Sequence, residues 1–192
     1  ALKWGATETA ELFIAWSPYV RLAVRDGGFD GSGDLTVGSR VRFREETEHG
    51  PAAAFEVLAK LPTAKASQNI SSGFVDFFGA ASVGKHLGHA GMIVGYYHLG
   101  VLSNQRPEGT LLEHTISAAL SRELTGPLQG YAELAGIFTP RQNLEALLFG
   151  LGLGYEVNAQ LILDLEGYLG LTSDADLAAI SAGLTVNLGS LF

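Results

Sequence analysis

The fold is decided by the stretch Ile180-Ser-Ala-Gly-Leu-Thr-Val-Asn-Leu-Gly-Ser-Leu-Phe192. As far as Leu188, apolar side chains occupy one parity of this stretch and small or polar side chains occupy the other. A period of two indicates a β-strand with one apolar face. The strand is about twice as long as the usual strand of about five or six residues in a soluble sheet. Together with the aromatic last residue, Phe192, this length predicts an outer-membrane β-barrel.

The composition fits a protein with a lipid-facing exterior. Of the 192 residues, 47% are hydrophobic and 17% are charged, whereas roughly 25% are charged in an average soluble domain. We expect a single transmembrane barrel domain over residues 1–192. The chain has no cysteine, which excludes disulfides and zinc–thiolate sites. Its formal net charge of −8 argues against nucleic acid as a partner, because phosphate binding needs clustered Lys and Arg.

Eleven segments are predicted to be strands, and none has a convincing helical period. They cover residues 1–6, 11–24, 34–45, 52–61, 73–86, 91–102, 111–123, 128–138, 144–156, 161–172 and 177–192. Tight, turn-rich links alternate strictly with links that are mostly longer or looser, such as 25–33, 62–72 and 103–110. In an up-and-down antiparallel barrel this alternation places all tight links on one rim, as short periplasmic turns, and the loose links on the outer rim.

The alternation also orients the chain. It places Phe192 at the periplasmic rim and Ala1 at the outer rim. Bacterial single-chain barrels have an even number of strands, so we expect about 12 strands, with one amino-terminal strand missing before Ala1 or supplied by a partner chain. Without it, an open edge in lipid would leave unpaired backbone groups at several kcal/mol each. The other explanation is a miscount by one strand.

Charged residues identify the face that lines the lumen. In the segment 161–171, Asp164 and Glu166 share one parity, whereas the other parity is mostly leucine. A charge facing the bilayer midplane costs about 2–4 kcal/mol, so the leucine parity faces lipid. In the segment 144–156 the inward parity is rich in glycine, which leaves space or permits close packing. A soluble β-sandwich is the alternative fold, but its polar face should be rich in Lys, Thr and Glu.

Charged residues of inward parity are the candidates for a functional site. Arg40, Arg42 and Arg44 alternate on one strand and should all point into the barrel. The inward acids lie on other strands and are Glu56, Asp76, Glu113, Glu133, Glu156, Asp164 and Glu166. Cations that face acids across a narrow lumen would orient and select polar solutes, as a channel lining does. The alternative is that these charges pair with each other and seal a packed interior.

Two local patterns are weak indications of ligand binding. Gly79-Ala-Ala-Ser-Val-Gly-Lys-His86 ends in His where a phosphate-binding loop has Ser or Thr, and no helix follows, so we reject it. His86 and His89 have no third metal ligand nearby in the sequence, which favours a solvated turn. We therefore expect neither a metal nor a cofactor.

The outward face carries a few polar residues. Lys85 and Arg122 lie near tight links, where they either snorkel to lipid head groups or act as solvated rim charges. His114 also points outward and would suit a surface lipid hydrolase. However, Ser117 and Ser121 have the opposite parity, and the chain has no Gly-x-Ser-x-Gly elbow. We therefore expect no enzymatic activity.

Four stretches carry strand-and-turn motifs. They are Gly33-Asp-Leu-Thr-Val-Gly-Ser-Arg-Val-Arg-Phe-Arg-Glu-Glu46 with a strand ending Leu61-Pro-Thr63, Gly152-Leu-Gly-Tyr155, Leu161-Ile-Leu-Asp-Leu-Glu-Gly-Tyr168 and the final strand. Here, and over nearly the whole chain, the sequence resembles the outer-membrane channels associated with phenol-degradation meta-pathways. The resemblance implies a transmembrane barrel with a channel or transport role and an additional amino-terminal strand region that this sequence lacks. It also implies that Phe192 is the signal recognised for barrel assembly.

We therefore expect an outer-membrane channel or transport protein of a Gram-negative bacterium. Its cargo would be small solutes, with apolar solutes as one candidate class. The first alternative is a structural barrel subunit of a larger envelope complex with a sealed lumen, and the second is a surface lipid hydrolase. The expected partners are outer-membrane lipid, the barrel-assembly machinery and, for the structural alternative, other envelope proteins.

Overall fold

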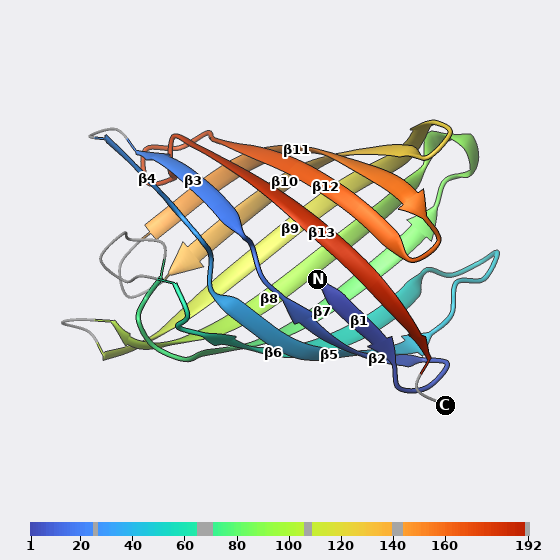
Figure 1. Ribbon diagram of the computed structural model, residues 1–192, viewed down its shortest axis with the longest axis horizontal. Coiled ribbons are helices and arrows are strands. Elements are labelled where there is room, and N and C mark those ends of the chain that lie inside the picture. The colour runs from blue at the N-terminus through green and yellow to red at the C-terminus, as the bar shows by residue number, and fades with distance from the viewer. Residues whose placement is uncertain (25–26, 65–70, 106–108, 140–143, 191–192) are drawn as a thin grey trace.

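The computed structural model of the protein describes residues 1–24, 27–64, 71–105, 109–139 and 144–190. It is nearly all β-structure (Figure 1). The strands are β1 (Leu2–Gly5), β2 (Ala10–Ala15), β3 (Tyr19–Val24), β4 (Gly27–Gly31), β5 (Leu35–Arg44), β6 (Ala52–Leu61), β7 (Asp76–His86), β8 (Met92–Gln105), β9 (Gly109–Thr125), β10 (Leu128–Thr139), β11 (Leu144–Asn158), β12 (Leu161–Gly170) and β13 (Ala178–Ser190). A short 3-10 helix, η2 (Gly88–Ala90), precedes β8. Within these ranges, no helix is long and apolar enough to cross a membrane.

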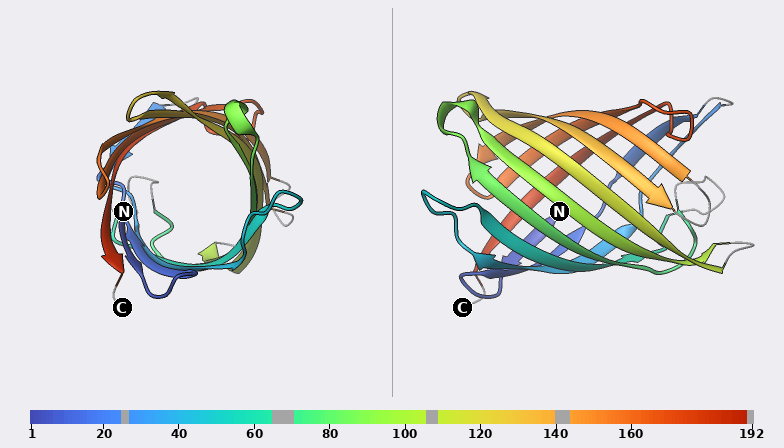
Figure 2. Two further views of the ribbon diagram at one scale, coloured as in Figure 1. Left: turned by 90° about the vertical axis from the view of Figure 1, so that its right-hand side faces the viewer. Right: turned by 180° about the vertical axis from the view of Figure 1, so that it is seen from behind.

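The strands form one sheet that closes on itself as a barrel (Figures 1 and 2). Its order is β1-β2-β5-β6-β7-β8-β9-β10-β11-β12-β13, and β13 returns to β1. Neighbours in this ring are antiparallel except β1 and β13, which are parallel because an up-and-down ring of 11 strands begins and ends in the same direction. The two extra strands, β3 and β4, continue the lines of β2 and β5. The predicted up-and-down barrel of about 12 strands is confirmed.

The strand predicted over residues 11–24 is interrupted. Its first half, β2, pairs with β1 and β5, whereas its second half, β3, pairs with β13 and β4. Pro18 lies in the interruption, and proline has no N–H to donate to a sheet. The line from β2 to β3 stays hydrogen-bonded to the line from β4 to β5 at this interruption. Gly33 N donates to Ser17 O at 2.8 Å, and the Trp16 indole donates to Gly33 O at 3.1 Å. The prediction of a loose link over 25–33 is wrong, since β4 occupies much of it.

The first residue does not lie at the outer rim, where the sequence pattern predicts it. Its ammonium group donates to Leu184 O, and its carbonyl accepts a hydrogen bond from Val186 N at 2.7 Å, part-way along β13 (Figure 1). The edge of β13 is therefore covered by β1 near one end and by β3 near the other. Together β1 and β3 close the ring along β13, whereas β4 pairs with β3 alone among the described strands. A strand before Ala1 stays a prediction.

Tight and loose links segregate to opposite ends of the barrel, as their alternation predicts. The tight links 6–9, 45–51, 87–91, 126–127 and 159–160 share the end at which β13 finishes (Figure 1). β6, β8, β10 and β12 finish at the opposite end, whereas the breaks 16–18 and 32–34 lie part-way along the wall. We refer to these ends as the tight-link rim and the loose-link rim. Phe192, predicted at the tight-link rim, lies outside the described residues.

Side-chain parity separates an apolar exterior from the lumen. On β11, Leu151 and Leu153 are 56% and 45% exposed, whereas Gly152 between them is buried. Asp164 and Glu166 of β12 lie on the inward parity and are partly shielded. Exposed apolar side chains follow the outward parity on the other strands and include Leu12, Val41, Phe55, Phe77, Ile93, Leu112, Leu134, Leu163 and Leu184. The wall therefore presents an apolar face to lipid and its charges to the lumen.

Candidate lumenal site

Arg40 on β5 is the centre of an ion-paired wall inside the barrel. The register places Glu11 of β2 and Glu56 of β6 directly opposite Arg40, one on each side. Nε and Nη2 of Arg40 donate to Oε2 of Glu56 at 2.8 and 2.5 Å, and Nη1 lies 3.4 Å from Oε1 of Glu11. Tyr96 of β8 donates its hydroxyl to Oε1 of Glu56 at 3.2 Å. The side chain of Glu56 is 8% exposed, and both of its oxygens have partners.

Arg42 and Arg44 continue the same parity toward the tight-link rim. Arg42 pairs with Glu45 at 2.8 Å and donates to a backbone carbonyl of the first tight link at 3.2 Å. The guanidinium of Arg44 lies against Gly50, where a Cβ would overlap it. The three predicted arginines therefore share one face. Arg40 and Arg42 reach acids on neighbouring segments rather than acids across the lumen.

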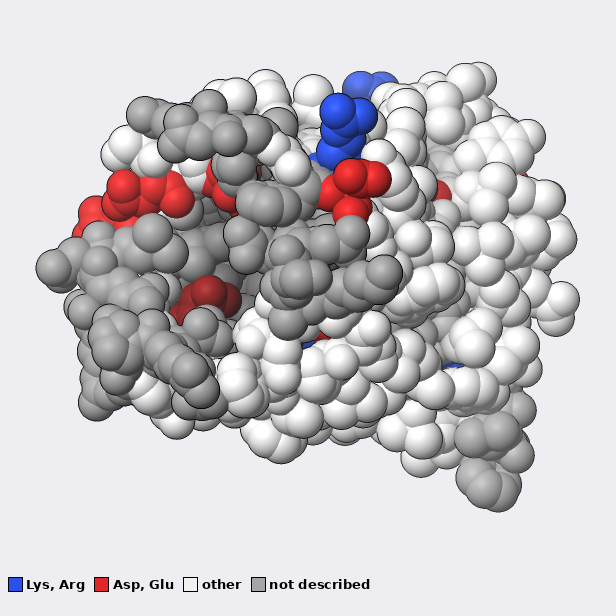
Figure 3. Space-filling model, turned by 60° about the vertical axis from the view of Figure 1, so that its left-hand side comes forward, with Lys and Arg blue, Asp and Glu red and all other residues white. Residues whose placement is uncertain are grey.

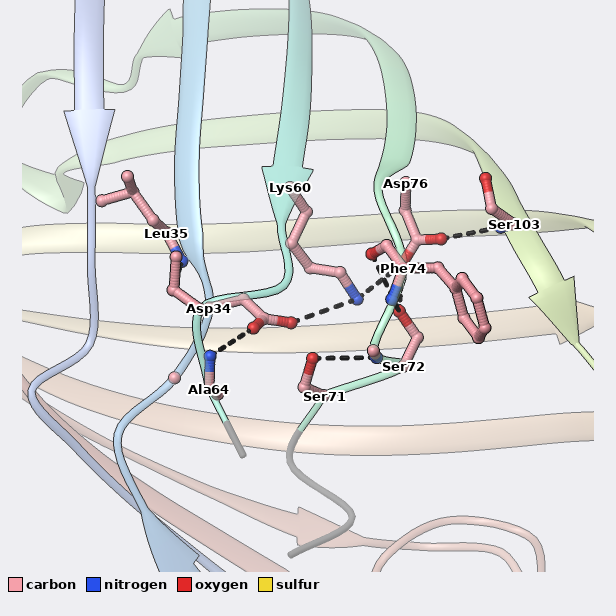
Figure 4. Close-up of polar contacts among 12 residues, drawn as sticks. Asp34, Leu35, Lys60, Ala64, Ser71, Ser72, Phe74, Asp76 and Ser103 are labelled. Carbon is pink, nitrogen blue, oxygen red and sulfur yellow. Dashed lines mark hydrogen bonds and ion pairs between the residues drawn. The ribbon is translucent and has the colours of Figure 1, made fainter. Parts of the chain in front are cut away.

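A second ion-paired group lies nearer the loose-link rim (Figure 4). Lys60 of β6 lies 2.7 Å from Oδ2 of Asp76 and 3.9 Å from Oδ2 of Asp34. Asp76 is fully buried, and its Oδ1 accepts a hydrogen bond from the backbone N–H of Ser103 at 2.7 Å. The hydroxyl of Ser72 donates to Oδ2 of Asp76 at 2.8 Å. A buried carboxylate needs such partners, and Lys60 is the cation that pairs with Asp76 in this group.

The same group is extended by two further contacts. Oδ1 of Asp34 accepts a hydrogen bond from the backbone N–H of Ala64 at 2.9 Å, which ties the chain after β6 to the residue before β5. Glu113, a predicted lumen-lining acid on β9, is partly buried and interacts electrostatically with Lys60 and Asp76. The ion-paired wall thus consists of the Arg40 and Lys60 groups and runs over β2 and β5 to β8.

On the opposite part of the barrel, β10 to β13, the lumenal acids bind tyrosines instead of cations. Tyr131 of β10 donates its hydroxyl to Oε2 of Glu166 on β12 at 2.7 Å. Between them lies Gly152 of β11, which is in register with both. A Cβ on Gly152 would overlap the Tyr131 ring. The tyrosine crosses its neighbouring strand because that strand has no side chain at this position.

A second tyrosine–glutamate bridge crosses β11 in the opposite direction, at the inward position next to Gly152. Tyr168 of β12 donates its hydroxyl to Oε2 of Glu133 on β10 at 2.8 Å. It crosses Gly150 of β11, where a Cβ would approach Cε1 of Tyr168 to 2.5 Å. The predicted role of the inward glycines in close packing is thus confirmed at both crossings.

The tyrosine-bridged wall retains its negative charge. No Lys or Arg in the described ranges forms an ion pair with Glu133 or Glu166. Ser181 of β13 donates to Oε1 of Glu166 at 2.6 Å, and the carboxylate of Asp164 lies over Gly183 of the same strand. The hydrogen-bond donors to Glu133 and Glu166 are neutral hydroxyl groups, so they satisfy hydrogen bonds without cancelling charge.

A polar hollow of about 500 Å³ lies inside the barrel next to the tight-link rim. Its charged and amide lining residues are Lys3, Glu8, Glu11, Arg40, Arg42 and Asn187. The side chain of Arg40 stays 42% exposed although it points into the barrel. This end of the lumen therefore has room for water or a small polar solute. Glu156, another predicted lumenal acid, is exposed near the end of β11.

Acidic side chains gather toward the loose-link rim, where Figure 3 shows several of them around a hollowed surface. Glu145, Asp174 and Asp176 are exposed at this end of the chain's described part. The acids at the rim and those of the tyrosine-bridged wall give the lumen and its mouth an excess of negative charge.

Sequence reasoning missed several members of both walls. Lys60 shares the parity of Glu56 on the same strand, so the alternation could have identified it. Tyr131 and Tyr168 also follow the inward parity of Glu133 and Glu166. Their hydrogen-bond partners lie two strands away, however, and that distance depends on the register of three strands, which the sequence pattern alone does not give.

The tight-link rim holds a separate polar group. Nζ of Lys85 donates to the carbonyls of Thr47 and Glu48 at 2.6 and 3.1 Å and lies 3.6 Å from Glu46. Nδ1 of His86 lies 2.6 Å from Oε2 of Glu46. This hydrogen bond lowers the pKa of the Glu46 carboxyl. Lys85 therefore fastens a turn, which supports the rim-charge interpretation over snorkelling.

The remaining polar candidates form no catalytic or metal constellation among the residues that the structure describes. Nδ1 of His114 lies 2.8 Å from the hydroxyl of Tyr97, whereas Ser117 is buried and Ser121 donates to a backbone carbonyl. No group of three or more His, Cys, Asp or Glu side chains in the described ranges could hold a metal ion.

The fold is shared with solved structures of outer-membrane channels. An outer membrane channel from Pseudomonas putida F1 matches with a TM-score of 0.61 and 15% identity, over 95% of this chain and 80% of that one. The NanC porin matches with a TM-score of 0.62 and 9% identity, over 97% of each chain. At these identities the likeness shows the fold. No protein-family model and no curated protein matches the sequence.

Proposed function

We propose that the protein is a passive channel of the bacterial outer membrane for small solutes. One observation carries the proposal, namely that Arg40 points into the barrel yet keeps 42% of its side chain exposed, beside a polar hollow of about 500 Å³. A packed, sealed interior would bury such a charge together with its partner. The shared fold with outer-membrane channels supports the proposal and the location.

The charge of the lumen favours cations over anions. Glu133 and Glu166 hold their charge without a paired cation in the described residues, whereas Arg40 is neutralised by Glu11 and Glu56. Rings or walls of unpaired carboxylates select for cations in channels. For neutral solutes, including the apolar class that the sequence suggests, the charge acts as a polar lining rather than as a selective one.

The test is single-channel conductance of the purified protein in planar lipid bilayers. We expect discrete conductance steps and a reversal potential in a salt gradient that indicates cation preference. Glu133→Gln combined with Glu166→Gln should shift the reversal potential toward zero, because it removes two uncompensated charges. Glu48→Gln, in an exposed turn at the rim, is the matched control. Absence of conductance at all voltages would contradict the channel proposal.

A structural barrel subunit is the second candidate, and the Lys60 group favours it. Asp76 is fully buried and its partners come from several segments, as in a sealed interior. Stable copurification with other envelope proteins, together with zero conductance, would support this candidate. A conducting monomer would exclude it.

The finer parts of the sequence interpretation enter here as proposals. Membership of the phenol-degradation channel family rests on the strand motifs, and barrel assembly directed by Phe192 rests on the terminal aromatic. A surface lipid hydrolase is disfavoured because the outward His114 contacts Tyr97 while Ser117 is buried on the inward face. We propose no enzymatic activity.

A further inference from the structure

The polar hollow next to the tight-link rim has the size of a ligand site inside the lumen. Its volume of about 500 Å³ lies within the range of about 300–1,000 Å³ that is typical of small-ligand sites. Three cations, Lys3, Arg40 and Arg42, and two acids, Glu8 and Glu11, line it. The class of ligand that it suits follows from those charges that lack a full partner.

The strand register brings Lys3 and Glu11 to the same lumenal face. β1 runs between β13 and β2 (Figure 1), with Lys3 opposite Asn187 of β13 and Phe13 of β2. Gly5, the next inward position of β1, lies opposite Glu11 and leaves the space there free of a side chain. Lys3 and Glu11 are therefore diagonal neighbours, a relation that separates two residues by about 7–8 Å. No ion pair joins them.

Glu11 is an acid without a full partner. Arg40 donates both of its carboxylate hydrogen bonds to Glu56, and its contact with Glu11 is longer, at 3.4 Å from Nη1 to Oε1. Oε1 of Glu11 accepts no hydrogen bond from the described residues, and the side chain is 30% exposed. One cation between two carboxylates leaves a negative charge in excess, to which Glu8 of the first tight link adds. Glu11 can therefore accept from a ligand's ammonium group.

Lys3 is a cation without a partner. It is half-buried in the lumen and forms no ion pair within the described residues. Beside it, the amide oxygen of Asn187 accepts a hydrogen bond from Gly189 N at 2.9 Å, which leaves the amide NH2 group to the hollow. Arg42, by contrast, is paired with Glu45. Lys3 and Asn187 together can donate to a ligand's carboxylate.

We propose that this hollow binds a small zwitterion of the α-amino acid type. The carboxylate of the ligand binds Lys3 and Asn187, and its ammonium group binds Glu11. A simple anion would leave Glu11 without a donor, and a simple cation would leave Lys3 without an acceptor. A zwitterion meets both, and having no net charge it is not repelled by the acids of the lumen. The site rests on the proposed function, because it names a class of solute for the channel.

The ligand class is tested with L-alanine and two analogues, propionate, which lacks the amine, and ethylamine, which lacks the carboxylate. Saturation-transfer difference NMR on the detergent-solubilised protein gives a dissociation constant for each. We expect alanine to bind about tenfold more tightly than either analogue, because each analogue loses one set of charge-assisted contacts. Equal binding of alanine and either analogue would overturn the zwitterion, and no saturable binding of any of the three would overturn the site.

Two variants assign the contacts. Lys3→Gln should weaken alanine binding about tenfold and abolish its advantage over ethylamine. Glu11→Gln should weaken alanine binding to a similar extent and abolish its advantage over propionate. Both variants should fold, because Lys3 has no ion pair to lose and Arg40 keeps its hydrogen bonds to Glu56. Alanine binding that is unchanged in either variant would overturn the corresponding contact.

The matched controls remove one charge of each sign near the same rim but outside the hollow. Arg122→Gln lies on the outward face of β9, opposite Gly130, and Glu48→Gln lies in an exposed turn. Both should bind alanine as the wild type does, and a tenfold loss in either would mean that the hollow is not the site.

Conductance is measured on the same preparations, so that the two proposals can fail separately. A barrel that conducts but does not bind alanine would contradict the site and leave the channel proposal standing. A barrel that binds alanine in the hollow but never conducts would contradict the channel proposal and retain the site as one that is open only at the tight-link rim.

Discussion

The two walls of the lumen satisfy their carboxylates in different ways. In the ion-paired wall, Glu56 and Asp76 are held by the cations Arg40 and Lys60 on adjacent strands. In the tyrosine-bridged wall, Glu133 and Glu166 are held by hydroxyl groups that reach across an intervening strand. The first wall needs a cation beside each acid, whereas the second needs a glycine on the strand that lies between donor and acceptor.

This difference has electrostatic and structural consequences. An ion pair removes net charge, and the loss of one member leaves the other member buried and uncompensated. A tyrosine satisfies the hydrogen bond and leaves the charge available to a solute in the lumen. One side of the lumen is therefore neutralised by ion pairs, whereas the other side keeps its negative charge. The following predictions separate the two arrangements by their energetic cost.

The largest loss of stability is expected for Lys60→Met in the ion-paired wall. It leaves Asp76, which is 0% exposed, without its cation, and breaking a buried pair in this way costs about 3–5 kcal/mol. Urea unfolding in lipid vesicles measures the free energy. Lys85→Met is the control and should lose less, since Lys85 lies at the rim and its pair with Glu46 is partly solvated. Equal losses in the two variants would mean that Asp76 is not stabilised by Lys60.

The crossing point of the tyrosine-bridged wall is tested by Gly152→Ala. The added Cβ would overlap the Tyr131 ring, which must move away from Glu166. Overpacking of this kind costs about 1–3 kcal/mol. Gly154→Ala, on the same strand and face, would place its Cβ 3.9 Å from Ile162 and should be near neutral. The interpretation fails if both alanines have the same effect on the unfolding free energy.

The sequence predicted the barrel well because its evidence is local. The two-residue period and the links give the eleven strands of the ring, the lumenal face of Arg40 and Glu133, and the rim that holds the tight links, but not the separate strands β3 and β4. The partners could not be predicted in the same way. Tyr168 meets Glu133 because three strands share a register, and Lys60 meets Asp34 because the chain before β5 folds toward it. Such pairings depend on positions far apart in the sequence.

A smaller effect is expected for Tyr168→Phe, which keeps the ring over Gly150 and removes the hydroxyl. The hydrogen bond to Glu133 is lost, at a cost of about 1.5–3 kcal/mol for a charged acceptor in a dry site and less in a lumen that holds water. We therefore expect about 1 kcal/mol. Tyr155→Phe, on the lipid face, is the matched control and should change nothing. A similar loss in both would show that the hydroxyl does not bind Glu133.

The smallest effect concerns the tight-link rim, where an acid is neither buried in a wall nor bridged by tyrosine. The hydrogen bond from His86 lowers the pKa of Glu46 in the folded protein relative to its ordinary value. A carboxyl with a lowered folded pKa stabilises the protein above the unfolded pKa, and the contribution disappears as the pH falls through the folded pKa. Wild type should therefore unfold at a higher temperature than Glu46→Gln at neutral pH. The two midpoints should converge as the pH falls through the folded pKa of Glu46, which lies below the ordinary value of this carboxyl. A constant difference between the two midpoints, followed from neutral to acid pH, would show that the contact stabilises the turn without its charge.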